Sequence, residues 1–110
     1  MAVKLLDAVL VTGASDTWGI RRLVTEHVVQ LTMGGTVVAT AVTIDLEGSL
    51  DDVTFFTLIS HPLSGAEIID EGVMFHVNNK LVKFVRVNLT TLTGGTDPTI
   101  TVLYDGEAFK

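Results

Sequence analysis

The stretch Val37–Leu50, VVATAVTIDLEGSL, decides the fold because apolar and polar residues alternate along its second half. Val42, Ile44 and Leu46 share one parity, and polar residues stand between them. Successive side chains of a strand point to opposite faces of a sheet, so this pattern predicts a half-buried strand. The same alternation recurs with Val85, Val87 and Leu89 in KLVKFVRVNLTTL, with Ile100, Val102 and Tyr104 in PTITVLY, and with His27, Val29 and Leu31 in RRLVTEHVVQLTM.

Turn signals separate these strand-like runs at short intervals and indicate the fold class. They are Gly34-Gly35, Gly48–Asp52, Asn78-Asn79, Gly94–Pro98 and Asp105-Gly106. Short strands with such turns predict an all-β chain: a single antiparallel β-sandwich domain over residues 1–110, of jelly-roll-like type. Only Ser64–Glu67, SGAE, has a helical signature, a capping box, so one short helical turn is expected near residues 64–70.

The composition is apolar and acidic, and it disfavours several kinds of partner. Of the 110 residues, 47% are hydrophobic and 18% are charged, and the net charge is −6. Binding to nucleic-acid phosphates requires a basic stripe. The few Lys and Arg are scattered along the chain, except for the pair Arg21-Arg22, so no direct nucleic-acid partner is expected. No apolar run is long enough to span a membrane, and Asp7 interrupts the apolar start, so neither a membrane partner nor a secretion signal is expected. Because few residues are charged, part of the surface must be neutral or apolar, and such a surface can be buried against a partner or a sister subunit. A homo-oligomer is therefore expected.

The stretch LVTGASDTWGI, Leu10–Ile20, resembles the glycine-rich turn of short-chain dehydrogenases, but its surroundings exclude that interpretation. A dinucleotide site needs a helix after the turn and a parallel sheet around it. The residues that follow alternate as a strand does, and Thr17 stands where the pattern requires a second glycine. We therefore expect a loop between two strands, with Gly13 and Gly19 supplying turn geometry.

Other candidate chemistry is weak, so we expect neither an enzyme nor a bound cofactor or metal. The acidic residues Asp45, Glu47, Asp51 and Asp52 lack the spacing of a calcium loop and are expected to form a solvated acidic face that protects a sheet edge. His27, His61 and His76 lie on separate segments and are expected to be ordinary half-exposed side chains. Ser49 lies in a stretch of turn-forming residues, EGSLDD, and not in the GxSxG motif of a nucleophile elbow.

Four residues are candidates for a protein interface: Trp18, Phe84, Arg86 and Leu103. Trp18 is the only tryptophan, and it is either a binding anchor or a cap over one end of the sandwich. Phe84 shares the face of Arg86, and Leu103 shares the face of Thr99 and Thr101, so apolar side chains stand on otherwise polar faces. This mixed parity predicts a second covered face, which we expect to pack against another subunit.

Two segments together resemble a known group of proteins. They are VTIDLEGSLDDVTFFTL, Val42–Leu58, and MFHVNNKLVKFVRVNLTTLTGGTDPTITVLY, Met74–Tyr104. Their order resembles that of small β-sandwich virion structural proteins of tailed bacteriophages, in which an LEGSLDG-type turn precedes an RVNL-type strand. A looser version occurs in discoidin-like and carbohydrate-binding jelly rolls. Here Asp52 replaces the usual glycine of the turn, and Phe55 or Phe56 replaces the usual tryptophan.

The resemblance implies a mechanical function in a phage particle. Such a protein would be a capsid decoration or cement protein located in the virion, assembled in the cytoplasm of the bacterial host. Its partners would be the major capsid protein or other virion subunits. A tail or head–tail component is an alternative within the same class, and a carbohydrate-binding surface module is the alternative from another class.

Overall fold

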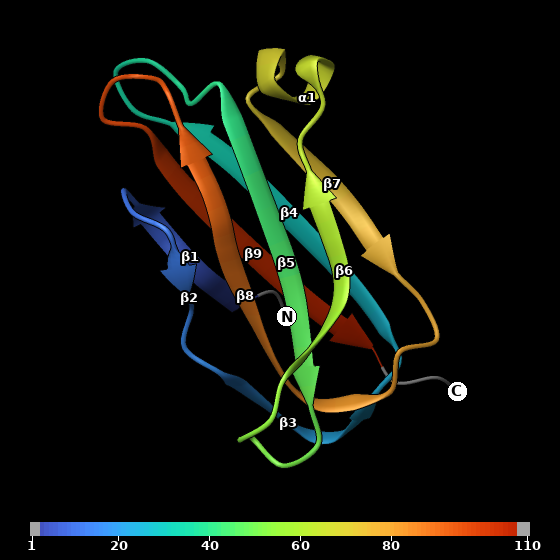
Figure 1. Cartoon of the computed structure of the whole chain (residues 1–110). Coiled ribbons are helices and arrows are strands. Elements are labelled where there is room, and N and C mark those ends of the chain that lie inside the picture. The colour runs from blue at the N-terminus through green and yellow to red at the C-terminus, as the bar shows by residue number, and fades with distance from the viewer. Residues whose placement is uncertain (1–2, 108–110) are drawn as a thin grey trace.

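The computed structural model describes residues 3–107 and consists of two antiparallel sheets packed face to face (Figure 1). One sheet has the strand order β1-β9-β4-β7, and we call it the four-stranded sheet. The other has the order β2-β8-β5-β6, with β3 also paired to β8, and we call it the five-stranded sheet. The elements are β1 (Val3–Val9), β2 (Gly13–Ala14), β3 (Trp18–Val24), β4 (Glu26–Gly34), β5 (Ala41–Ser49), β6 (Phe56–Pro62), α1 (Gly65–Ile69), β7 (Gly72–Val77), β8 (Val82–Thr93) and β9 (Thr99–Glu107).

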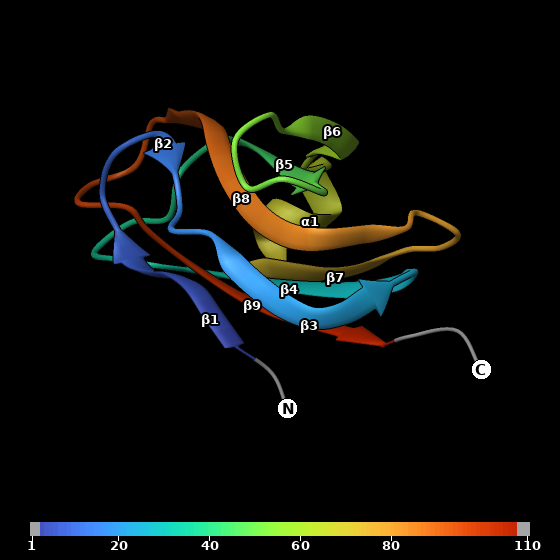
Figure 2. The ribbon, with the colours of Figure 1, turned by 90° about the horizontal axis from the view of Figure 1, so that it is seen from below.

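The core lies between the sheets and is built from the alternating residues of the long strands. Figure 2 separates the two layers, with β5, β6 and β8 in one and β4, β7 and β9 in the other. The predicted inward residues of β5, β8 and β9 are all buried: Val42, Ile44, Leu46, Val85, Val87, Leu89, Ile100, Val102 and Tyr104. The predicted antiparallel jelly-roll-like sandwich is therefore confirmed. Burying these branched side chains supplies the main driving force for folding.

The predicted helical turn is α1, and its capping box is complete. Ser64 Oγ accepts a hydrogen bond from the Glu67 backbone N–H, and a Glu67 carboxylate oxygen accepts one from the Ser64 N–H at 2.8 Å. That backbone donor, followed by His61, holds the pKa of Glu67 below its usual range. The His61 ring stacks on Phe75 of β7, with centroids 4.6 Å apart, and its Nε2 lies 3.1 Å from Glu67 Oε1. These contacts join α1 to β6 and β7. No helix within residues 3–107 is long and apolar enough to cross a membrane.

Glu71, just after α1, is a position where glycine would stabilise the fold. Its φ of 61° lies in the left-handed region, which is unfavourable for a residue with a Cβ atom. We expect Glu71→Gly to raise the free energy of unfolding by about 0.5–1 kcal/mol, measured by urea titration. The control is Asp70→Gly, because Asp70 has an ordinary φ of −75° and should lose stability. Equal effects of the two substitutions would contradict the prediction.

Candidate functional site

The structure divides the four predicted interface residues between two sheets. Trp18 lies on β3 and Phe84 and Arg86 lie on β8, all in the five-stranded sheet, whereas Leu103 lies on β9 of the four-stranded sheet. The expectation of one covered face shared by Phe84 and Leu103 was therefore wrong. Alternation assigns a residue to one side of its own strand, but it does not say to which sheet that strand belongs.

Trp18 lies on the edge strand β3 of the five-stranded sheet, and Phe84 lies on the neighbouring strand β8. Trp18 pairs with the core residue Val85, and directly paired residues share a face, so Trp18 starts on the core side of β3. Its exposure of 43% leaves much of the ring in solvent, so it covers the edge of the sandwich only in part. A Cβ atom at Gly19 would lie 3.3 Å from the Phe84 ring, so this ring covers Gly19 of its own chain.

Arg86 is engaged inside the chain. Its Nε donates to Glu47 Oε1 at 2.6 Å, and its guanidinium lies 4.2 Å from the centroid of the Phe55 ring. Asn88 Nδ2 lies 3.5 Å from the other oxygen of Glu47. Charge-assisted and cation–π contacts of this kind hold the β5–β6 loop against β8. Arg86 thus holds the sheet face together through its Nε and the plane of its guanidinium.

Leu103 lies in a small depression on the outer face of the four-stranded sheet. This depression has a volume of about 200 Å³ and is lined by Val28, Gln30, Met74, Leu103, Tyr104 and Asp105. Met74 and Gln30 pair across β4 and β7, and Gln30 pairs in turn with Leu103 of β9. The polar Gln30 thus lies between the apolar side chains of Met74 and Leu103, so this face offers only a small, shallow apolar surface.

The acidic residues do not form the expected edge-protecting face. They include residues of β5, which pairs with β8 on one side and β6 on the other, so β5 is an interior strand. Glu47 is bound to Arg86, and Asp51 is bound within the turn that follows β5. Within residues 3–107 no group of three or more His, Asp or Glu side chains is placed to hold a metal ion. Glu47 and Asp51 thus serve the local structure of the sheet and its turn.

The turn after β5 is closed by Ser49 and Asp51. Ser49 Oγ donates to Asp51 Oδ1 at 2.8 Å and accepts from the N–H groups of Asp51 and Asp52. Asp51 Oδ1 also accepts from the N–H groups of Val53 and Thr54, at 2.9 Å each. The backbone N–H of Thr54, followed by that of Val53 and the Ser49 hydroxyl, lowers the pKa of Asp51 to about 2. The side chains of Ser49 and Asp51 in the EGSLDD motif are therefore bonded within the turn itself.

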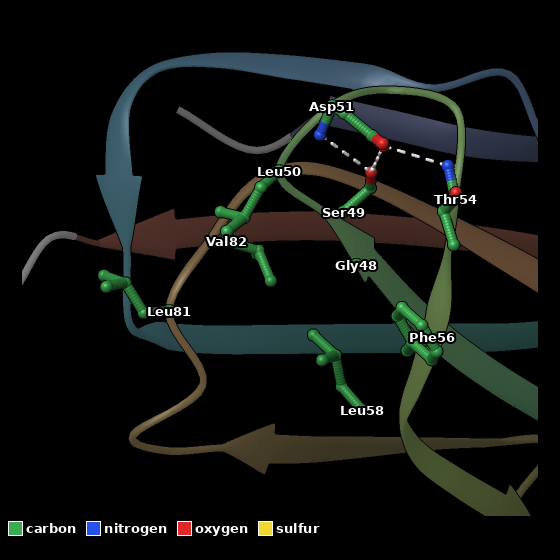
Figure 3. Close-up of a pocket in the computed structure, with 9 residues that line it drawn as sticks. All are labelled: Gly48, Ser49, Leu50, Asp51, Thr54, Phe56, Leu58, Leu81 and Val82. Carbon is green, nitrogen blue, oxygen red and sulfur yellow. Dashed lines mark hydrogen bonds between the residues drawn. The ribbon is translucent and has the colours of Figure 1, made fainter.

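A mostly apolar pocket opens beside this turn (Figure 3), and the turn lies at the end of the sandwich opposite α1 (Figure 1). It has a volume of about 360 Å³. Leu50 and Phe56 come from the two ends of the β5–β6 loop and Leu81 precedes β8, and they are 62%, 70% and 53% exposed. The pocket is lined by Gly48, Ser49, Leu50, Asp51, Thr54, Phe56, Leu58, Leu81 and Val82.

The pocket is suited to receiving an apolar group. Its few polar atoms belong to the turn, where Ser49 and Asp51 bond to each other and to backbone N–H groups. The lining contains no histidine or lysine that could act as a base beside Ser49. Sequence reasoning missed Leu50, Phe56 and Leu81, although apolar residues flanking turn segments were a signal that could have suggested them.

Gly48 makes room for the floor of the pocket. A Cβ atom there would lie 2.6 Å from Val82 Cγ1 and 3.1 Å from Leu58 Cδ1. We expect Gly48→Ala to lower the free energy of unfolding by about 1–3 kcal/mol, because the β-branched Val82 cannot rotate away freely. Urea unfolding would measure it. Gly65→Ala is the matched control, since no atom lies within 4 Å of a Cβ at this helical position, and it should stabilise the protein. Effects of the same sign would contradict the steric account.

The three histidines differ, and the expectation that all would be half-exposed was wrong for His27. His27 is 1% exposed, His61 is half-buried against Phe75, and His76 is exposed on β7. His27 Nδ1 lies 2.7 Å from the Tyr104 hydroxyl, and its Nε2 lies 2.8 Å from the Lys80 carbonyl oxygen. A carbonyl only accepts, so Nε2 carries the proton and Nδ1 accepts from Tyr104. His27 is thus a neutral, fully bonded core residue.

This geometry makes stability depend on pH through His27. Burial lowers the pKa of His27 from its ordinary 6.5, so the unfolded chain takes up a proton at higher pH than the folded chain. The stabilisation is therefore complete above pH 6.5 and is lost as the pH falls below it, by at most about 1.4 kcal/mol per pH unit. Urea titrations between pH 7.5 and about 5.5, above the range in which carboxylates titrate, should show this slope, and His27→Ala should remove it. An unchanged slope in that variant would contradict the assignment.

Comparison with known proteins supports the fold. No protein-family model matches the chain, and no curated protein matches it in sequence. Among solved structures, it is similar to CBM32-3 from a family 31 glycoside hydrolase of Clostridium perfringens, with a TM-score of 0.62 and 10% identity over 92% of this chain and 72% of that chain. It is also similar to the SPBc2 prophage-derived protein YomS, with a TM-score of 0.55 and 9% identity over 94% of this chain and 90% of that one. At these identities the likeness establishes a shared β-sandwich fold.

Proposed function

We propose that this chain is a non-enzymatic structural protein of a tailed-bacteriophage particle, and within that class a capsid decoration or cement protein. The observation that carries the proposal is the open apolar pocket at one end of the sandwich, whose polar atoms are bonded within the turn. Such a surface offers burial to a neighbouring subunit and offers no convergent polar groups to a reaction.

Two resemblances support the phage assignment. The LEGSLDD and RVNL segments resemble those of phage virion proteins. The prophage-derived YomS shares the fold over 94% of this chain and 90% of its own, so the two proteins correspond over nearly their whole lengths. On this proposal the protein is located in the virion and contacts the major capsid protein or other virion subunits, without direct nucleic-acid or membrane contacts.

A decoration protein gains its affinity from repetition. A capsid presents the same surface many times, and linked weak contacts add up to a large total avidity. The chain fits this use because a sandwich of two sheets leaves edge strands and loops at its borders that can contact neighbours. If copies of the protein also associate with one another, each contact with the capsid can be weak, because linked copies bind together.

The test is the copy number of the chain in purified particles. Phage particles would be isolated on a density gradient from an induced lysate of the bacterium that encodes the chain, and the chain would be quantified against the major capsid protein by mass spectrometry. A copy number comparable to that of the major capsid protein would support decoration. A few copies per particle would place the chain in the tail or head–tail connector instead, and absence from particles would contradict the virion role.

A glycan-binding surface module is the second candidate function. The fold similarity to CBM32-3 favours it, together with the 70% exposed Phe56 ring beside the pocket, because an aromatic face can pack against a sugar ring. A glycan array with the wild-type protein and Phe56→Ala would test this candidate. Binding that is lost in the variant would support the module, whereas the virion proposal expects no bound glycan.

A further inference from the structure

Three exposed apolar side chains at the pocket form one surface, which we call the end patch: Leu50, Phe56 and Leu81. Figure 3 shows them around the pocket, with Leu58 and Val82 at its floor. Large apolar residues that remain this exposed and stand together are typical of protein contact surfaces. Because the pocket is hollow between them, a projecting side chain of a partner would be enclosed on several sides.

Charges flank the end patch with opposite signs. Asp51 and Asp52 follow Leu50 on the β5–β6 loop, and both are exposed. The low pKa of Asp51 keeps its carboxylate negative at all physiological pH values. Lys80 and Lys83 bracket Leu81 and Val82 on the other segment of the pocket, and both are exposed. Asp51 and Leu81 stand on different sides of the pocket in Figure 3, and Lys80 and Lys83 are the sequence neighbours of Leu81 and Val82, so the acidic and basic segments border different sides of the apolar centre.

We infer that a second copy of this chain binds the end patch, with the two copies related by a two-fold axis. In such an arrangement the apolar centres meet, and the acidic side of each copy faces the lysine side of the other. A uniformly basic partner would place positive charges opposite Lys80 and Lys83. An uncharged partner would pair with neither the acidic nor the basic side. The patch is thus complementary to itself. This inference does not depend on the virion role.

The first experiment measures the mass of the protein in solution. Sedimentation velocity and light scattering of the wild type should give twice the chain mass of 11.8 kDa. Phe56→Asp and Leu81→Asp should each raise the dimer dissociation constant by at least about tenfold, because each places a charge in the apolar centre. Ile69→Asp is the matched control. Ile69 is 81% exposed on α1, at the opposite end of the molecule, so this substitution should leave the dimer mass unchanged.

The second experiment exchanges the charges. One variant carries Lys80→Glu and Lys83→Glu, and the other carries Asp52→Lys while Asp51 remains to hold the turn. At low ionic strength the first variant alone should be monomeric, because its two copies present like charges to one another, and the second alone should dimerise more weakly than the wild type, because its acidic side no longer carries a net charge. An equal mixture should form a heterodimer, because the unchanged acidic side of the first variant then meets the unchanged lysine side of the second. Thermal melts of each variant confirm folding, and recovery of the dimer in the mixture excludes misfolding as the cause.

Several outcomes would overturn the inference. A wild type that stays monomeric at roughly 1 mM would do so, and so would dimers that the end-patch variants leave intact. A monomer that loses particle binding on Phe56→Asp would assign the patch to a different virion subunit, which overturns the second-copy inference while the proposed function stands. A dimer with the expected variant behaviour that is absent from phage particles would overturn the proposed function alone.

Discussion

Replacing His27 with alanine is expected to lower the free energy of unfolding by about 3–5 kcal/mol, which is a large part of the stability of a domain of this size. His27 is 1% exposed, so the substitution leaves a cavity that the surrounding strands can fill only in part. It also removes both hydrogen-bond partners of the ring. The Tyr104 hydroxyl and the Lys80 carbonyl would then be buried without a partner, at about 1–3 kcal/mol each before relaxation.

The position of Lys80 extends this effect to the pocket. Lys80 lies in the connection between β7 and β8, which joins the two sheets. Two hydrogen bonds at Lys80 fix this connection. Its carbonyl accepts from His27 of β4, and its N–H donates to the carbonyl of Thr25, just before β4, at 3.2 Å. Leu81 follows directly and forms one wall of the pocket. Removing His27 should therefore increase amide hydrogen exchange at Lys80 and Leu81 as well as lowering stability.

Urea titration with two comparison variants tests this prediction. Tyr104→Phe removes a single hydroxyl and should cost about 1–3 kcal/mol, because His27 Nδ1 loses its donor. Burial raises the pKa of Tyr104 far above its usual range, so this hydroxyl remains protonated and able to donate at any relevant pH. His76→Ala alters an exposed histidine on β7 and should change stability by no more than about 0.5 kcal/mol. A loss for His27→Ala no larger than that for His76→Ala would show that the network does not stabilise the fold.

His27 also shows how far the sequence predicts this structure. Strand positions followed from alternation, because burial of one sheet face imposes a period of two on Val42, Ile44 and Leu46. The helical turn followed from Ser64 and Glu67, because a capping box is satisfied by groups three residues apart. These are local properties. The burial of His27 depends on Tyr104, which is 77 residues away, and only the pairing of β4 with β9 brings the two together.

The candidate site was predicted less well for the same reason. Phe84 and Leu103 have similar patterns in the sequence, yet their strands pair into different sheets. The pocket is formed by residues on both sides of the β5–β6 loop and by Leu81, which is 25 residues beyond Phe56 in the chain. Gly48 was expected to serve a turn, but its role is to leave space for Val82 and Leu58. Contacts between distant segments are set by strand order, which alternation does not encode.

The Gly95→Ala substitution is expected to cost about 2–5 kcal/mol, for a reason that again lies between distant segments. Gly95 has a φ of +78°, where a Cβ atom is unfavourable by about 1–2 kcal/mol. A Cβ atom there would also lie 2.5 Å from the Val37 carbonyl oxygen and 2.7 Å from that of Val38. These are backbone atoms, so they cannot turn aside as a side chain would. The loop would have to move, at a further cost of about 1–3 kcal/mol.

The contact matters because it joins two loops at the end of the sandwich. Val37 and Thr96 form an isolated β-bridge, with their N–H groups donating to each other's carbonyl oxygens at 3.1 and 2.9 Å. This bridge ties the β4–β5 connection to the β8–β9 connection, and thereby fixes the start of β5 relative to β8. Displacing Gly95 would break the bridge and expose its four polar groups. In a thermal melt the midpoint should fall by about 4–8 °C for each kcal/mol lost.

Gly13→Ala separates the two contributions to the Gly95 effect. Gly13 also has a positive φ, of +147°, but no atom lies within 4 Å of a Cβ built there. Gly13→Ala therefore carries backbone strain without a collision, and its loss of stability should be the smaller by about 1–3 kcal/mol. Equal losses would mean that backbone conformation alone requires glycine at position 95. The larger loss expected for Gly95→Ala would instead show that the close approach of the Val37 and Val38 carbonyls excludes a side chain at position 95.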